Sequence, residues 1–169
     1  MIHSAIHDAR RDLNALIHIH SREGMAVASS VDKLLPVCQD SVFLEPISYH
    51  NFHGIVVGEG EKKALAKDFV APSKCLMMRN HGLLTGGRTL EEAFLLMYYL
   101  HSVCKVYVDA GYTHRTVPSE MVIPDAVIDA SMEAVAVNIK TSSFGKMDFE
   151  SLARQLDYAG LETGYPYQH

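Results

Sequence analysis

The sequence has 169 residues, of which 48% are hydrophobic and 21% are charged, and its formal net charge is -5. This composition and length predict a single globular domain over residues 1–169 with its own core. The acidic balance and the lack of a basic cluster argue against nucleic-acid binding. No apolar run approaches the roughly 20 residues of a membrane span, and no signal segment follows Met1, so we expect a cytoplasmic protein.

The N-terminal part of the sequence predicts two helices around one strand. Residues 3–11 have the apolar spacing of a short helix, and residues 15–19 form an apolar run typical of a buried strand. Ser21 is suited to cap a helix that continues over 21–31. The stretch 36–46, bounded by prolines, is expected to be irregular.

The middle of the sequence predicts further alternation of strands and helices. We expect a strand at 54–57, a helix with a charged outer face at 59–69 and a strand at 74–78. A turn at 81–82 leads from that strand into the next, at 83–85. Four elements therefore follow one another closely, as in a layered α/β domain.

A long helix and two further helices complete the expected elements. Thr89 and Glu92 have the spacing of a capping box, so we expect a helix from there to about Asp109. Further helical patterns cover 125–138 and 147–157. The apolar face of the last helix is expected to comprise Phe149, Leu152, Ala153 and Leu156.

Two histidines in the first strand have the spacing of metal ligands. His18 and His20 alternate with Ile17 and Ile19, so both imidazoles are expected on one face of the strand. About 0.6 such pairs would occur by chance in a chain with 10 histidines, so the pair alone is weak. His81, before a glycine in the predicted turn, would complete a three-histidine site with an open coordination position, typical of catalytic zinc.

Several segments together resemble one known family. The stretch 9–21, ARRDLNALIHIHS, and the stretch 79–84, RNHGLL, are similar to the two metal-binding signatures of the class II aldolase/adducin family. Between them, YHNFHGI at 49–55 is similar to a segment of adducin head domains and their bacterial relatives. The runs at 86–100 and 149–157 continue the resemblance, which covers nearly the whole chain.

The resemblance implies a fold, a metal and a substrate class. The fold would be a three-layer α/β/α sandwich around a largely antiparallel sheet. His18, His20 and His81 match the three family histidines that hold a divalent ion, usually zinc. Family enzymes are lyases or epimerases that act on sugar phosphates or small hydroxy-carbonyl compounds, for which the ion supplies Lewis acidity.

The family's acid/base glutamate has no match in this chain. It lies upstream of the first family histidine by slightly more residues than precede His18 here. The resemblance therefore implies a domain that lacks the family's N-terminal segment, has no identified catalytic residue and is a poor catalyst. An alternative is a non-catalytic, adducin-like domain for assembly or cytoskeletal binding, which the segment 49–55 favours.

Family members assemble as homo-oligomers, commonly tetramers. The resemblance therefore implies self-association of this chain. The apolar run 94–100 in the long predicted helix is consistent with it, because it offers more apolar surface than one helix face requires.

The remaining candidate residues favour ordinary structural roles. His50 and His53, in a predicted loop, could contribute to a metal or substrate site, but hydrogen bonds that fix the loop are the favoured interpretation. For the acids near the histidine motif we favour a position on the solvated surface over a role as catalytic base. These acids are Asp8, Glu23 and Glu45. The cysteines are expected to be buried thiols, namely Cys38, Cys75 and Cys104.

Overall fold

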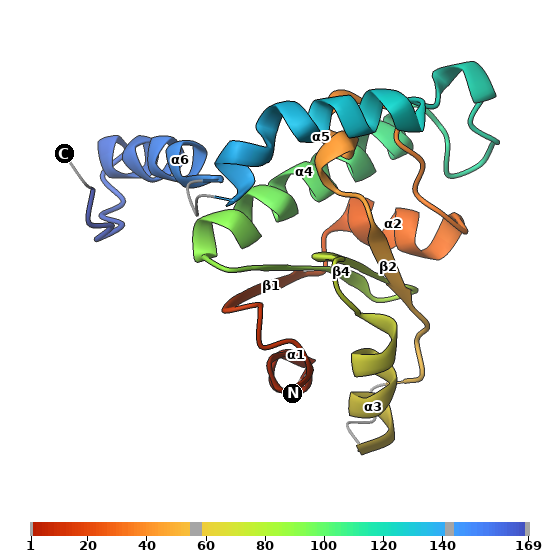
Figure 1. Cartoon of the computed structure of the whole chain (residues 1–169), viewed down its shortest axis with the longest axis horizontal. Coiled ribbons are helices and arrows are strands. Elements are labelled where there is room, and N and C mark those ends of the chain that lie inside the picture. The colour runs from red at the N-terminus through yellow and green to blue at the C-terminus, as the bar shows by residue number, and fades with distance from the viewer. Residues whose placement is uncertain (1, 55–58, 141–143, 168–169) are drawn as a thin grey trace.

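The structure is a computed structural model that describes residues 2–54, 59–140 and 144–167. Within these ranges a four-stranded sheet lies between two pairs of helices, and further helices extend toward the C-terminus (Figure 1). The expected α/β layers are therefore confirmed. None of the helices in these ranges is long and apolar enough to cross a membrane.

The sheet has the strand order β1-β4-β3-β2. Its outer strands are β1 (Ala15–Ile19) and β2 (Ile47–His50). Strand β4 (Gly82–Gly87) pairs antiparallel with both β1 and β3 (Cys75–Met78), whereas β2 pairs parallel with β3. The expected sheet, largely antiparallel, is confirmed and has one parallel edge.

Helices cover both faces of this sheet. On one face, α1 (Ile2–Ala9) and α3 (Glu59–Asp68) contact each other. On the other face, α2 (Arg22–Ser30) and α4 (Leu90–Asp109) pack together and against β4 (Figure 1). The chain thus has the three layers that the family resemblance implies.

The core is divided by the sheet into two clusters. Along β3, Cys75 and Met77 enter the cluster beneath α2 and α4, while Leu76 and Met78 enter the cluster beneath α1 and α3. All four side chains are buried. Because helices cover both faces, the inner strands are apolar on both sides and lack the polar alternation of a half-exposed strand.

Capping begins two helices as expected, but Glu92 acts differently. The hydroxyl of Ser21 accepts the Gly24 amide at the start of α2, and the hydroxyl of Thr89 accepts the Glu92 amide at the start of α4. The buried Glu92 carboxylate accepts a hydrogen bond from the Arg88 backbone N–H at 2.6 Å and from Lys74 Nζ at 2.6 Å. The ammonium group of Lys74, which is distant in sequence, thus pairs with the buried carboxylate. The expected capping box, in which Glu92 would accept the Thr89 amide in return, is therefore wrong.

Helix α4 lies at the centre of the molecule. It contacts the sheet, α2, the 3₁₀ helix η1 (Gln39–Phe43) and α6 (Lys146–Tyr158). Most apolar residues of the run 94–100 are consequently buried within the chain, and Tyr98 is the large side chain that stays exposed. The expected surplus of apolar surface on this helix is therefore mostly absorbed by the fold.

The C-terminal region consists of short and long helices around α4. The 3₁₀ helix η2 (Ser119–Met121) precedes α5 (Asp125–Lys140), which contacts η1. In Figure 1, α5 runs across the side of α4 that faces away from the sheet, and α6 lies beyond one end of α4.

The apolar face expected on α6 is confirmed in part. Phe149 packs edge to face against Phe94 of α4 at a centroid distance of 5.1 Å, and Ala153 is buried. Leu156 is 48% exposed. The apolar face of α6 is therefore buried at Ala153 and is largely exposed at its last apolar position.

One strand differs from expectation. Residues 55–57 of the expected strand at 54–57 lie outside the described residues, and Gly54 has a φ of 101°. Strand β2 forms earlier, at Ile47–His50, where the sequence indicates no element. Four residues that alternate apolar and polar give too short a pattern to detect. The other expected helices and strands are confirmed, with bounds within about two residues, but β1 is half-buried at the edge of the sheet and not buried as expected.

Candidate metal centre

His18 and His20 lie side by side at the end of β1. His18 is within the strand, opposite Leu84 of β4, and His20 directly follows the strand. Their ring centroids are 4.7 Å apart, and their Nε2 atoms are 2.8 Å apart. The alternation of strand side chains therefore places both imidazoles on one side, as the spacing predicts.

His81 reaches the same point from the turn between β3 and β4. Asn80 has a φ of 56°, a left-handed conformation that asparagine tolerates well. The His81 ring centroid lies 5.0 Å from that of His18 and 4.7 Å from that of His20. Ligand nitrogens of the three residues all lie within 4.8 Å of one another. The fold thus brings together the three histidines that the sequence singles out.

The hydrogen bond of His18 fixes which nitrogen faces the centre. His18 Nδ1 lies 2.8 Å from the carbonyl oxygen of Leu83, which can only accept, so Nδ1 carries the hydrogen. A neutral His18 then has its lone pair on Nε2, the atom that faces His20. Backbone carbonyls commonly orient metal-binding histidines in this way.

Burial favours the neutral form of two of these imidazoles. The pKa of His18 is lowered from its usual 6.5 by burial and then by the neighbouring His81 and His20 rings. The pKa of His81 is lowered by burial and then by His20. Neutral imidazole is the form that binds metals, so the three residues suit a divalent ion.

Gly82 allows the strands to approach closely beside these rings. A Cβ atom at this position would lie 2.4 Å from the Ile19 carbonyl oxygen and 3.0 Å from Cδ2 of the His20 ring. Any side chain here would push β4 away from the end of β1. The glycine after His81 is therefore required by the packing of the centre itself.

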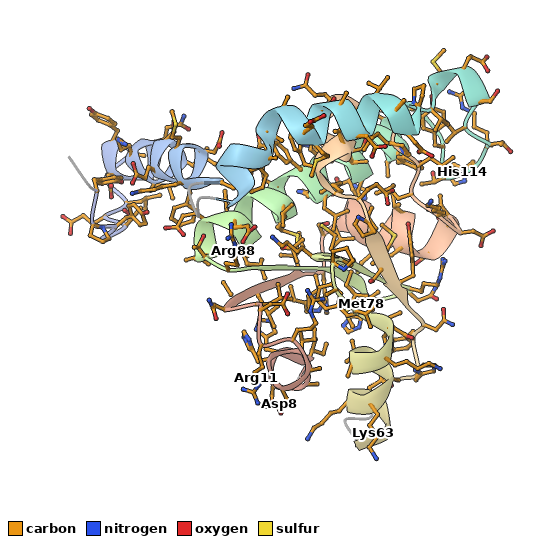
Figure 2. The ribbon with its side chains drawn as sticks, in the orientation of Figure 1. Asp8, Arg11, Lys63, Met78, Arg88 and His114 are labelled. Atoms are coloured by element: carbon orange, nitrogen blue, oxygen red, sulfur yellow. The ribbon has the colours of Figure 1, made fainter. Side chains whose placement is uncertain are left out.

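The three histidines open into a cavity of about 710 Å³. Its walls come from α1, α3 and the ends of β1, β2 and β3, and Met78, labelled in Figure 2, is part of the lining. Phe52 packs beside His81 at a centroid distance of 5.9 Å. The volume is in the range of sites for small organic ligands.

A second group of polar side chains lines the same cavity. His50, the last residue of β2, is 2% exposed and contacts Asp68 Oδ2 at 2.8 Å through Nδ1 and Glu61 Oε1 at 2.9 Å through Nε2. His53 Nδ1 lies 3.2 Å from Glu61 Oε2. The pKa of Glu61 is lowered, first by the hydrogen bond from His50. The expected hydrogen bonds of both histidines are confirmed, but His50 belongs to a strand and not to a loop.

Glu61 is the site residue that the sequence did not indicate. It is the one carboxylate among the described residues that line the cavity. In the sequence it stands in the stretch Glu59 to Lys63, in which every residue but Gly60 is charged, as is typical of a solvated helix face. Nothing local distinguishes Glu61 from its charged neighbours.

The other candidate acids and thiols have structural surroundings. The described lining of the cavity does not include Asp8, Glu23 or Glu45. Glu23 instead pairs with His101 at 3.2 Å. Burial raises the pKa of the Cys75 thiol to about 12, as it does for the third cysteine, Cys104. Cys75 and Cys104 are buried as expected, whereas Cys38 is half-buried.

Comparison with known proteins identifies the family. A model of the class II aldolase and adducin N-terminal domain matches residues 1–108. The chain belongs to this family. The resemblance of its histidine segments, and the class II aldolase-like fold, are thereby confirmed.

Two kinds of relative are similar to the chain. Over 178 residues, 99% of this chain, the sequence is 35% identical to alpha-adducin of Rattus norvegicus, of which the match covers 24%. Over 160 residues, 92% of this chain, it is 35% identical to a candidate class 2 aldolase of Pseudomonas aeruginosa, of which the match covers 60%. The chain thus spans about a quarter of the adducin and less than two thirds of the bacterial relative.

Solved structures share the fold. An aldolase II superfamily protein from Pseudomonas syringae is 34% identical with a TM-score of 0.78, and the match covers 95% of this chain and 63% of that one. L-fuculose 1-phosphate aldolase from Glaciozyma antarctica is 27% identical with a TM-score of 0.69, covering 94% and 59%.

We predict that Gly82→Ala destabilises the fold. Because the new Cβ would meet the Ile19 carbonyl oxygen, the free energy of unfolding should fall by roughly 1–3 kcal/mol, the usual cost of overpacking. The matched control is Gly60→Ala on α3, where a Cβ meets nothing within 4 Å and the change should be neutral or slightly stabilising. Urea unfolding of both variants measures the difference, and equal stabilities would contradict the assigned role of Gly82.

We also predict that the metal-free protein loses stability in mild acid. Unfolded His18 and His81 take up protons near pH 6.5, whereas the folded residues take them up only at lower pH. The unfolded state therefore binds more protons as the pH falls below 6.5, and the free energy of unfolding decreases.

Unfolding in urea with a chelator, at pH 7.5 and pH 5.5, checks this dependence. The pH-dependent loss should be smaller in His18→Asn than in wild type. It should be unchanged in His114→Asn, because His114 is an exposed residue that does not line the cavity and lies well away from Met78 in Figure 2. An identical loss in wild type and His18→Asn would exclude His18 as a source of the effect.

Proposed function

We propose that residues 1–169 form a single class II aldolase/adducin domain whose centre binds one divalent ion through His18, His20 and His81. The observation that carries the proposal is the contact between the Nε2 atoms of His18 and His20, with Nδ1 of His18 directed at the Leu83 carbonyl. Zinc is the ion that best suits three neutral imidazoles with an open position.

The proposed chemistry belongs to a lyase or epimerase lineage. When bound, a divalent ion supplies Lewis acidity toward a carbonyl or hydroxyl oxygen. The three histidines would hold it at the wall of the cavity, and Phe52 would shield one side of His81 from water. A small hydroxy-carbonyl compound or sugar phosphate fits this setting, supported by the similarity to an L-fuculose 1-phosphate aldolase.

Proton transfer has no assigned residue in this proposal. Glu61, the carboxylate of the described cavity lining, already accepts hydrogen bonds from His50 and His53. A group committed to two partners is a poor candidate for moving a proton to or from a substrate.

A second candidate function is adducin-like assembly without catalysis. The observation that favours it is the 35% identity to alpha-adducin over 99% of the chain. Under this alternative the domain would be a non-catalytic, cytoplasmic binding module with a cytoskeletal partner. A bound metal would favour the first candidate, because an assembly surface gives no reason for three imidazoles to converge in a cavity.

Metal analysis tests the proposal directly. Protein purified without chelator should contain bound zinc, cobalt or manganese, and a His18→Ala/His20→Ala variant should contain one equivalent less per chain. His114→Ala, an exposed histidine, is the control and should match wild type. Equal metal content in the wild type and the double variant would contradict the proposal.

We further propose that the chain forms a homo-oligomer, with a tetramer as the arrangement typical of the family. Most apolar residues of α4 are buried within the chain and are not available for a contact between subunits. The support for this proposal is therefore the family relationship. Light scattering after size exclusion should give a mass above the 18.7 kDa of one chain. A monomeric mass that persists on concentration would refute it.

A further inference from the structure

His50 is held between two carboxylates at the end of the sheet. Its Nδ1 contacts Asp68 and its Nε2 contacts Glu61, at 2.8 and 2.9 Å, and its side chain is almost wholly buried. Glu61 and Asp68 are seven residues apart on α3, so they lie two turns apart on one face of that helix. Both carboxylates therefore approach the imidazole from the same helix.

The group combines donor atoms that a cation could share. His50 directs Nε2 at Glu61 Oε1 and Nδ1 at Asp68 Oδ2. A divalent ion between His50 Nε2 and Glu61 would take the place of the hydrogen bond there, and the Asp68 carboxylate would accept the hydrogen on Nδ1.

We propose that His50, His53 and Glu61 bind a second divalent transition-metal ion, with Asp68 as a positioning residue. His50 would bind through Nε2, His53 through Nδ1 and Glu61 through its carboxylate. Two imidazoles and one carboxylate are a common ligand set for zinc and iron, and a carboxylate that accepts the other ring hydrogen commonly orients such a histidine.

The spacing of the three ligands fits an ion. A zinc ion bound at about 2.1 Å holds neighbouring tetrahedral ligands about 3.4 Å apart. His50 Nε2 lies 2.9 Å from Glu61 Oε1, and His53 Nδ1 lies 3.2 Å from Glu61 Oε2, so the two imidazoles contact different oxygens of one carboxylate. One ligand atom from each of the three residues lies within 4.8 Å of the others, and the half-exposed His53 can adjust to bring them around one ion.

The second site is separate from the three-histidine centre, but two of its ligands, His50 and Glu61, line the same cavity. Its ligands come from β2, the following loop and α3, whereas the other centre uses β1 and the β3–β4 turn. Phe52, between His50 and His53 in sequence, packs beside His81. A ligand in the cavity could therefore meet both ions, and each site can be removed without altering the residues of the other.

Metal titration with variants of each site tests the proposal. The full chain, stripped by chelator and titrated with Zn²⁺ alone or Co²⁺ alone, should lose one equivalent in His53→Ala/Glu61→Gln relative to wild type. His114→Ala/Glu120→Gln, which alters an exposed histidine and an exposed glutamate, is the matched control and should lose none. Asp68→Asn should weaken binding at this site by about 10- to 100-fold.

The outcomes separate this proposal from the first centre. If both sites bind, wild type takes up two equivalents, and His18→Ala/His20→Ala and His53→Ala/Glu61→Gln each take up one. If only the second site exists, metal is lost in the latter variant alone. Unchanged stoichiometry in His53→Ala/Glu61→Gln, with a native circular dichroism spectrum, overturns the proposal and leaves a hydrogen-bonded network that ties α3 to β2. If that variant is unfolded, His53→Ala alone gives the same comparison, since its ring is half exposed.

Discussion

The backbone of β4 meets the end of β1 at Gly82, where a Cβ atom would lie 2.4 Å from the Ile19 carbonyl oxygen. This close approach sets the antiparallel register that places His18 opposite Leu84 and allows the Leu83 carbonyl to orient the His18 ring. It also brings the turn that carries His81 against the end of β1. The candidate metal centre is therefore a consequence of strand pairing, and its ligands need no specialised loop.

The sequence predicts those elements whose signals are local. Ser21 and Thr89 begin helices as expected because a cap depends on one hydroxyl and the amide three residues later. The predicted role of Glu92 in the capping box is wrong because its carboxylate binds Lys74, which comes close only once the sheet has formed. Strand β2 also depends on the fold, since its four residues become a strand by pairing in parallel with the buried β3.

The candidate site shows the same division. The spacing of His18 and His20 indicates a shared face of one strand, and the resemblance to a family adds His81 from more than sixty residues away. The partners of His50 could not be found in this way. Glu61 and Asp68 look like ordinary charged residues of a solvated helix, and only the packing of α3 beside β2 directs both at one imidazole.

The strand order explains why both histidine groups reach one cavity. Strands β1 and β2 are the two edges of the sheet, yet His20 and His50 lie at ends that both open beneath α1 and α3. A helix layer that covers the sheet over its apolar residues thus leaves a polar rim where the strands end. An L-fuculose 1-phosphate aldolase shares this layered fold, and alpha-adducin is similar to the chain in sequence. Because a fold alone does not set a function, what this cavity can bind depends on the side chains of the rim, where four histidines line the described cavity besides His3.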